Sequence, residues 1–411
     1  MITTRESLPL IETVAPADQA AVAEVVRTAR DQEKAIYPIG GGSALDYGVC
    51  PGVPGVGLSL KNLKRVVDHA VDDMTITVEA GVTMAQLSEL LAAQRQRLPV
   101  DAVRPGQATI GGVVATGAFG PRRYACGTIR DYVLGLRAVD GQGSAFSAGG
   151  RVVKNAAGYD LCRLLVGSLG TLAVITQVTL MVRPQPETSA FLVADLLDFD
   201  QAERLLDGLV RTKTLPVAVE LLTRRAQQGN PVLGPMVQQS AARLFVGFEG
   251  TAGEVEWMVD RLRDQWRELG IAAPIAVAAS DAPALWQWLR ESDGSAAEVQ
   301  INVRPGATAR LIENLVELDG ACSIRAHAGN GVIRLGLPPR EPEDFVMFLR
   351  GRLRPAVVAA RGKMVVRSYP DDVELTAEDV WGPPGDGAAV MRAIKDRFDP
   401  DGILNRGRFV F

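Results

Sequence analysis

The segment "RPGQATIGGVVATGAFGPRRYACGTIRDYVLGL", residues 104–136, decides how this chain folds, because it concentrates glycine to an unusual degree. Six of its glycines fall within 22 residues, at positions 106, 111, 112, 117, 120 and 127, separated by threonine and alanine more than by large side chains. Such a surface lets backbone N–H groups turn towards an anion and lets a flat ring approach the chain closely. The segment therefore indicates a binding surface built from backbone.

A second glycine cluster lies upstream in "AIYPIGGGSALDYG", residues 35–48, where a strand-like run enters three glycines and a serine. Gly40 and Gly42 open a G-x-G pattern, but the third glycine of the dinucleotide fingerprint would fall at Leu45, and no G-K-[ST] of a P-loop follows. Taken alone, the cluster favours a tight turn. Two clusters far apart in sequence suggest one extended ligand held from two sides, which suits a dinucleotide better than a single phosphate.

The composition of the whole chain bounds its function class. Its 411 residues are enough for two or three domains with buried cores, and 47% hydrophobic and 22% charged residues are typical of a soluble globular protein. A net charge of −4 without a basic block argues against nucleic acid as a partner.

The four cysteines are Cys50, Cys126, Cys162 and Cys322, and they lie far apart without any C-x-x-C motif. This spacing excludes a zinc site or an iron–sulfur cluster of the usual kinds, and scattered thiols suit a reducing cytosol. We expect four separate, buried small residues.

The first twenty residues lack a basic region followed by an apolar core, so no signal peptide is evident and we expect a cytoplasmic protein. The uncharged run "LLVGSLGTLAVITQVTLMV", 164–182, has the length of a membrane span. Its glycines, threonines and β-branched alternation instead favour a buried helix end, a turn at Gly170 and a buried strand. We therefore expect no transmembrane segment, and contact with a membrane only through partner subunits.

The chain changes character at "RPQPET", 183–188, whose two prolines indicate a domain boundary. Residues 189–369 then show the order β-α-β, β-α-β twice, which predicts two ferredoxin-like units side by side. We expect three parts: residues 1–185, residues 189–369, and a C-terminal segment over 371–411.

Four ordered stretches carry a family resemblance: "YPIGGGSALDYG", "TIGGVVATGAFGPRRYACGTIRDYVLG", "GGRVVKNAAGYDLCRLLVGSLGTLAVIT" and "FDPDGILNRGRF". Together they resemble the PCMH-type FAD-binding family of vanillyl-alcohol oxidase, and within it most closely the FAD-binding E subunits of bacterial glycolate oxidase, or glycolate dehydrogenase. The resemblance implies an α+β fold: a PCMH-type FAD-binding domain of two α/β subdomains, and an α+β cap of two ferredoxin-like units. It also implies that residues 371–411 return to the FAD domain.

The resemblance implies a set of FAD-binding residues. The loop 38–45 would wrap the pyrophosphate, a second group would pack along the flavin and ribityl chain, a third would line the adenine side, and the tail would reach the flavin. In that order these are Pro38, Ile39, Gly40, Gly41, Gly42, Ser43, Ala44 and Leu45; Thr109, Ile110, Gly111, Gly112, Thr116, Gly117 and Gly120; Gly127 and Ile175; and Asn405. Because the first loop has no histidine and Cys126 is the only thiol near these loops, we expect noncovalent FAD.

Catalytic hydroxy-acid members of the family resemble one another in an H-A-G-D-G-N-x-H run whose two histidines help to hold a metal. This chain has "HAGNGVIR", 327–334. Asn330-Gly331 predicts a two-residue hairpin turn that places residues 327 and 334 opposite each other, roughly 5 Å apart at Cβ. Since Arg334 stands at the second position and stays protonated, we expect no metal site. Arg325, His327 and Arg334 would share one face, either as a carboxylate site or as a basic strip.

Three functions remain open from the sequence. One is an FAD-bearing redox subunit of a multi-subunit glycolate oxidase, relaying electrons with a homologous catalytic flavoprotein and an iron–sulfur subunit. Another is a self-sufficient FAD-dependent dehydrogenase of a small 2-hydroxy acid such as glycolate or D-lactate, with Arg325 and Arg334 holding the carboxylate. The last is a structural FAD-binding subunit.

Overall fold

A computed structural model describes residues 8–150, 159–271, 273–291 and 294–410. The described chain divides into two units. The first, which we name the cleft unit, comprises residues 8–119, 127–185 and 375–410. The second, the cap unit, comprises Pro186–Glu374 together with the short upstream segment Gly120–Cys126.

The cleft unit contains two sheets. Strands β1, β3 and β2 form a parallel sheet in that order, and β4, β5, β9, β7 and β8 form an antiparallel one, with β10 and β6 pairing separately. Its elements are β1 (Leu10–Val14), α1 (Gln19–Asp31), β2 (Ala35–Ile39), β3 (Gly55–Ser59), β4 (Val66–Ala70), β5 (Thr75–Glu79), α2 (Met84–Ala92), β6 (Gln96–Arg97), α3 (Ile110–Thr116), the short 3₁₀ turn η1 (Ile129–Asp131), β7 (Val133–Asp140), β8 (Ala145–Gly149), α5 (Leu161–Leu165), β9 (Ala173–Met181), β10 (Arg183–Pro184), α12 (Ala377–Trp381) and α13 (Ala388–Phe398).

Local sequence explains where these helices begin. Asp18 caps the N-terminus of α1, because its carboxylate accepts a hydrogen bond from the backbone amide of Ala21 at 2.9 Å. Thr83 starts α2, as predicted, and forms a reciprocal pair of hydrogen bonds with Gln86. Both bonds satisfy amides that a helix leaves without an internal partner at its N-terminus.

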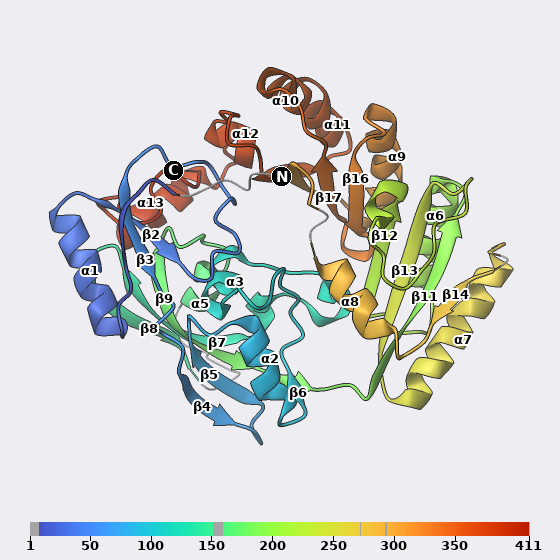
Figure 1. Ribbon diagram of the computed structural model, residues 1–411, viewed down its shortest axis with the longest axis horizontal. Helices are drawn as coiled ribbons and strands as arrows, with labels where there is room; N and C mark the ends of the chain where they lie inside the picture. The colour runs from blue at the N-terminus through green and yellow to red at the C-terminus, as the bar shows by residue number, and fades with distance from the viewer. Residues whose placement is uncertain (1–7, 151–158, 272, 292–293, 411) are drawn as a thin grey trace. The chain divides into compact units, whose positions relative to one another are not determined.

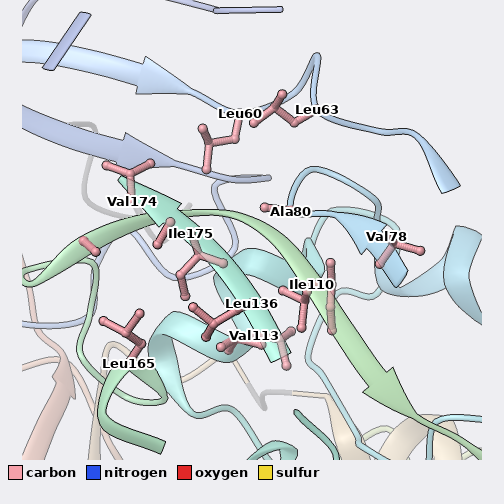
Figure 2. Packing of buried hydrophobic residues seen from close by; sticks show 14 of the residues in the cluster. Leu60, Leu63, Val78, Ala80, Ile110, Val113, Leu136, Leu165, Val174 and Ile175 are labelled. Carbon is pink, nitrogen blue, oxygen red and sulfur yellow. The ribbon is translucent and has the colours of Figure 1, made fainter. Parts of the chain in front are cut away.

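One hydrophobic core runs through the cleft unit. Figure 2 shows Ile110 and Val113 of α3 packed beside Leu136 and Leu165, with Val174 and Ile175 of β9 close by. Because α3 is pinned to the core by its apolar face, its other face is free to line a site. The uncharged run 164–182 is part of this core and forms the end of α5, a turn and β9, as predicted. Within the described residues, no helix has both the length and the apolar character needed to cross a membrane.

The cap unit repeats one strand–helix order twice in a single sheet. The eight strands follow the order β14-β11-β13-β12-β16-β17-β15-β18, and the two halves meet where β12 pairs with β16. Its elements are α4 (Arg123–Cys126), β11 (Thr188–Leu196), α6 (Phe199–Val210), β12 (Ala218–Thr223), η2 (Arg224–Gln227), β13 (Ala242–Gly250), α7 (Ala252–Glu268), β14 (Ile275–Val277), α8 (Ala282–Arg290), β15 (Ala297–Asn302), η3 (Pro305–Ala307), α9 (Thr308–Leu318), β16 (Ser323–His327), η4 (Ala328–Asn330), β17 (Val332–Leu337), α10 (Pro342–Phe348), the π-helical turn η5 (Leu349–Leu353), α11 (Arg354–Ala359) and β18 (Lys363–Ser368).

Both halves have the ferredoxin-like order. Helices α6, α7 and α9 lie on one face of the sheet, and α8, which connects the halves, lies on the other (Figure 1). Alternate residues of β11 explain this division, because Phe191 faces α8 and packs on Trp286 with ring centroids 4.5 Å apart. Since α8 covers the first half, the polar residues on the same face of the second half are left to line a cavity.

Candidate functional site

A cleft in the cleft unit gathers the two glycine clusters. It contains about 820 Å³ of space unfilled by protein atoms, part of it open to solvent. Its lining residues are Leu8, Pro38, Gly40, Gly41, Gly42, Ser43, Ala44, Leu45, Tyr47, Leu60, Thr109, Gly111, Gly112, Ala115, Thr116, Leu169, Gly170, Ala173, Val174, Ile175, Asn405 and Arg408.

One wall of the cleft is a loop of backbone donors. The loop 40–45 follows β2, and none of its six amides donates a hydrogen bond to another described part of the chain. Arg104 donates to the carbonyl of Ser43, and Arg408 donates to the carbonyls of Leu45 and Tyr47 at 2.6 and 2.5 Å. These bonds hold the loop by its carbonyls and bring positive charge beside it. Uncommitted amides next to fixed cations suit an anion such as a pyrophosphate.

Glycine allows the two clusters to meet. A Cβ atom on Gly41 would lie 1.6 Å from the carbonyl oxygen of Gln107, and one on Gly40 would lie 2.3 Å from Oγ1 of Thr109. In α3, a Cβ atom on Gly111 would lie 2.7 Å from that of Ala80. The glycines at 40, 41 and 111 therefore permit close packing of the chain against itself. That packing in turn shapes the cleft.

A second wall of the cleft, which we name the far wall, is apolar and is held by the C-terminal tail. Leu169 and Gly170 both adopt left-handed backbone, with φ of 54° and 66°, and lead into the residues of β9 that line the cleft. The side-chain amide of Asn405 donates to the carbonyl of Leu169 at 2.5 Å. The backbone amide of Asn405 also bonds the carbonyl of Ile36 at 2.8 Å. A dinucleotide needs an anion-binding edge and flat apolar walls, and this cleft supplies both.

A smaller cavity lies in the cap unit, with about 420 Å³ of space unfilled by protein atoms, part of it open to solvent. Its lining residues are Gly120, Pro121, Glu220, Leu289, Arg290, Glu291, Glu298, Arg325, His327, Arg334 and Gly336. Nδ1 of His327 lies 2.8 and 2.9 Å from the two carboxylate oxygens of Glu220, and both side chains are buried. A carboxylate in this position orients an imidazole.

The hairpin of the cap differs from the prediction. Ala328–Asn330 form a 3₁₀ turn and Gly331 adopts left-handed backbone, so the loop has four residues where two were predicted. His327 is therefore opposite Val332, and Arg334 is opposite Arg325. The predicted pairing of residues 327 and 334 is wrong, although Arg325, His327 and Arg334 do share one face and one cavity.

Arg325 is largely committed to structure. Its Nη1 donates to the carbonyls of Trp288 and Glu291 at 3.1 and 2.9 Å, and its guanidinium lies 4.8 Å from the centre of the Trp288 ring. The side chain thus binds the C-terminal end of α8, where a cation is favoured.

Comparison with known proteins covers both units. The FAD binding domain family matches residues 12–149, and the C-terminal domain family of FAD linked oxidases matches residues 185–309 and 383–409. A D-2-hydroxyglutarate dehydrogenase from Xanthomonas citri pv. viticola is 31% identical over 425 residues, which cover 96% of this chain and 88% of that protein. The chain belongs to the FAD-linked oxidase family.

Two further relatives match part of this FAD-linked oxidase. A D-lactate dehydrogenase from Archaeoglobus fulgidus is 35% identical over 241 residues, covering 57% of this chain and 53% of that protein. Glycolate oxidase subunit GlcE from Escherichia coli is 40% identical over 138 residues, covering 33% of this chain and 39% of that protein. The chain therefore spans about half, or less, of the length of these two relatives.

A solved alkyldihydroxyacetonephosphate synthase has the same fold, with a TM-score of 0.69 and 17% identity, covering 96% of this chain and 75% of that one. The predicted α+β fold class, a PCMH-type FAD-binding domain with a cap of two ferredoxin-like units, is confirmed. FAD as the cofactor and the oxidoreductase class of the family are confirmed as well.

Thirteen of the 18 predicted cofactor residues line the cleft of this FAD-linked oxidase, and five do not. Ile110 is fully buried in the core, and Ile39 packs in a small cluster beneath the loop. Gly117 ends α3 in left-handed backbone, and Gly127 is also left-handed, beside Asp131. Gly120 lines the cap cavity instead.

Of the apolar far wall, the sequence predicted only Ile175, and it did not predict Arg408 or the other wall residues, Leu169, Gly170, Ala173 and Val174. The far wall was findable, because "GSLGTLAVIT" belongs to the motif that carries the resemblance. The expectation of four buried cysteines is wrong for Cys50, which is exposed, whereas Cys126, Cys162 and Cys322 are buried. Burial raises the pKa of Cys162 to about 11 and that of Cys322 to about 12, so neither is a reactive thiolate.

Proposed function

We propose that this chain is the FAD-bearing redox subunit of a glycolate oxidase-type complex, which relays electrons with a homologous catalytic flavoprotein and an iron–sulfur subunit. The observation that carries the proposal is the cap hairpin. Arg334 stands where catalytic relatives have the second histidine of their metal pair, and an arginine cannot ligate a cation. The similarity to GlcE supports the same assignment.

FAD would be held by the cleft without a covalent bond. The amides of the loop 40–45 would bind the pyrophosphate, and Gly111, Gly112 and Thr116 would lie along the flavin and ribityl chain. Ile175 would line the adenine side and Asn405 would hold the far wall. The residues that line the cleft include no histidine or cysteine, the usual points of attachment. Bound FAD would supply a two-electron acceptor that can release its electrons singly.

The partners follow from what this chain lacks. Its scattered cysteines supply no ligand set for an iron–sulfur cluster, so a relay to such a cluster needs another chain. A metal-bearing, homologous flavoprotein would provide substrate oxidation.

The test is to purify the chain alone with FAD and to assay glycolate and D-lactate with an artificial dye. We expect bound, acid-releasable flavin and negligible turnover, with activity restored when the homologous flavoprotein and the iron–sulfur subunit are co-expressed. Turnover by the isolated chain comparable to that of the complex would overturn the proposal.

A self-sufficient 2-hydroxy-acid dehydrogenase is the second candidate, and the buried His327–Glu220 pair favours it. An imidazole oriented by a carboxylate can accept a hydroxyl proton without a metal, and Arg334, with Arg325 behind it, would bind the substrate carboxylate. The near full-length similarity to a D-2-hydroxyglutarate dehydrogenase supports this candidate. The assay of the isolated chain separates the two functions, and His327→Gln should abolish turnover only under the second.

A further inference from the structure

A buried lysine links the two walls of the FAD cleft. Lys395 of α13 is buried, and its ammonium donates to three acceptors: Asp399 at 2.5 Å, the carbonyl of Thr171 at 2.8 Å and the carbonyl of Leu404 at 3.2 Å. Burial lowers the pKa of Lys395, and the fully buried carboxylate of Asp399 opposes that shift. Burying an ammonium group costs free energy unless each of its N–H donors has an acceptor. The three acceptors meet this requirement and fix the position of the Lys395 side chain.

The first acceptor belongs to the far wall. The carbonyl of Thr171 follows the left-handed pair Leu169 and Gly170, which line the cleft. A non-glycine residue in left-handed backbone costs roughly 1 kcal/mol and persists where its surroundings hold it. The tail holds this turn twice, through Asn405 at the carbonyl of Leu169 and through Lys395 at that of Thr171.

The other acceptors lead to the wall that carries the amide loop. Asp399 accepts the amides of Ile403 and Leu404 at 3.1 and 2.8 Å. Leu404 in turn bridges to Ile36 in β2, the strand that ends at the amide loop 40–45. One buried ion pair thus joins the turn at 169–171 to the strand that presents the pyrophosphate-binding loop.

We infer that Lys395, through its ion pair with Asp399, is a positioning residue for FAD. Its hydrogen bonds go neither to the loop amides nor to the residues that line the cleft, and it sets the spacing between the two walls. The inference rests on FAD binding in the cleft. It predicts that loss of the pair weakens FAD binding beyond the loss of protein stability that any buried pair would cause.

The test uses the full chain and the double variant Lys395→Met/Asp399→Asn, which leaves no unpaired buried charge. We expect FAD to bind at least about tenfold more weakly. A loss of this size corresponds to one or two charge-assisted hydrogen bonds, here those by which Lys395 holds the two walls. We also expect a smaller FAD-induced rise in melting temperature and an altered visible circular dichroism of the bound flavin.

The matched control is Arg243→Met/Asp195→Asn, which removes a comparably buried pair in the cap unit, where Arg243 and Asp195 are joined at 2.5 and 3.1 Å. It should lower stability and leave FAD affinity unchanged. If the Lys395 variant loses stability equally with and without FAD, and keeps wild-type affinity and spectrum, the pair is merely structural and the inference falls. If that variant does not fold, Lys395→Gln is judged by the same criteria. Failure of the wild-type chain to bind FAD would refute the proposed function instead.

Discussion

The FAD cleft and the cap cavity present different groups to a ligand. The cleft offers backbone amides on a loop held by arginines at its carbonyls, and apolar walls. The cap cavity offers ionisable side chains, among them Glu220, Glu298, His327 and Arg334. Binding by backbone amides depends on how closely the chain segments approach one another. Binding by side chains depends on which residues are present and on the register of the strands that carry them. The two regions should therefore fail under different kinds of substitution.

The largest effect is expected from Gly41→Val. Because a Cβ atom at this position would lie 1.6 Å from the carbonyl oxygen of Gln107, the two glycine clusters must separate and the amide loop is displaced. We expect complete loss of the yellow flavin on purification, measured by absorbance at the flavin maximum. The control is Gly106→Ala, in the second cluster, where an added Cβ atom meets nothing within 4 Å. A variant at Gly41 that keeps its flavin would show that the loop tolerates side-chain volume.

Two of the buried thiols, Cys162 and Cys322, give a second comparison, with one of the two in each region. Cys162 lies in the cleft unit and has a pKa near 11, so about one molecule in a thousand carries its thiolate at pH 8. Cys322 lies in the cap unit, with a pKa near 12. We expect a thiol-reactive dye to label exposed Cys50 first, and both buried thiols only through local opening, with labelling accelerating as pH rises towards their pKa values. Peptide mass spectrometry would follow each site.

Saturating FAD should slow the labelling of Cys162 more than that of Cys322, since the ligand stabilises the unit that binds it. Equal protection of both thiols would show that the cleft and cap units open together. In that case the two units would differ in how they bind a ligand but not in how readily they open.

The sequence predicted the cleft better than the cap hairpin, for a physical reason. Glycine density marks places where backbone must come close, and residues 40–45, Thr109 and Gly112 do line the cleft. Glycine also serves left-handed backbone, and Gly117 and Gly127, both left-handed, do not line the cleft although the sequence predicted them at the ligand.

The register of the hairpin formed by β16 and β17 could not be predicted from the local sequence. Asn330-Gly331 fits a two-residue turn, but the same pair also ends a four-residue loop that begins with a 3₁₀ turn. Pairing across β16 and β17 decides between them, and that pairing depends on tertiary packing. The His327–Glu220 contact spans 107 positions in sequence, and no local pattern announces it.

A third expected effect is in the cap. Glu220→Leu would leave the buried imidazole of His327 without its acceptor, at a cost of about 3 kcal/mol in the free energy of unfolding. FAD content should stay at one per chain, because neither residue lines the cleft. Chemical denaturation with flavin absorbance as a second readout would measure both. Loss of flavin together with stability would show that the cap supports the cofactor.

The smallest effect is expected from Ser43→Ala in the amide loop. Ser43 lines the cleft, and its carbonyl accepts a hydrogen bond from Arg104, which the substitution leaves in place. If amides bind the pyrophosphate, removal of the hydroxyl should change the dissociation constant of FAD by less than about twofold, since no backbone donor is lost. Titration of the apoprotein, followed by flavin fluorescence, measures this directly. A tenfold loss would mean that the hydroxyl itself binds phosphate, so that the cleft, like the cap cavity, depends on side-chain identity.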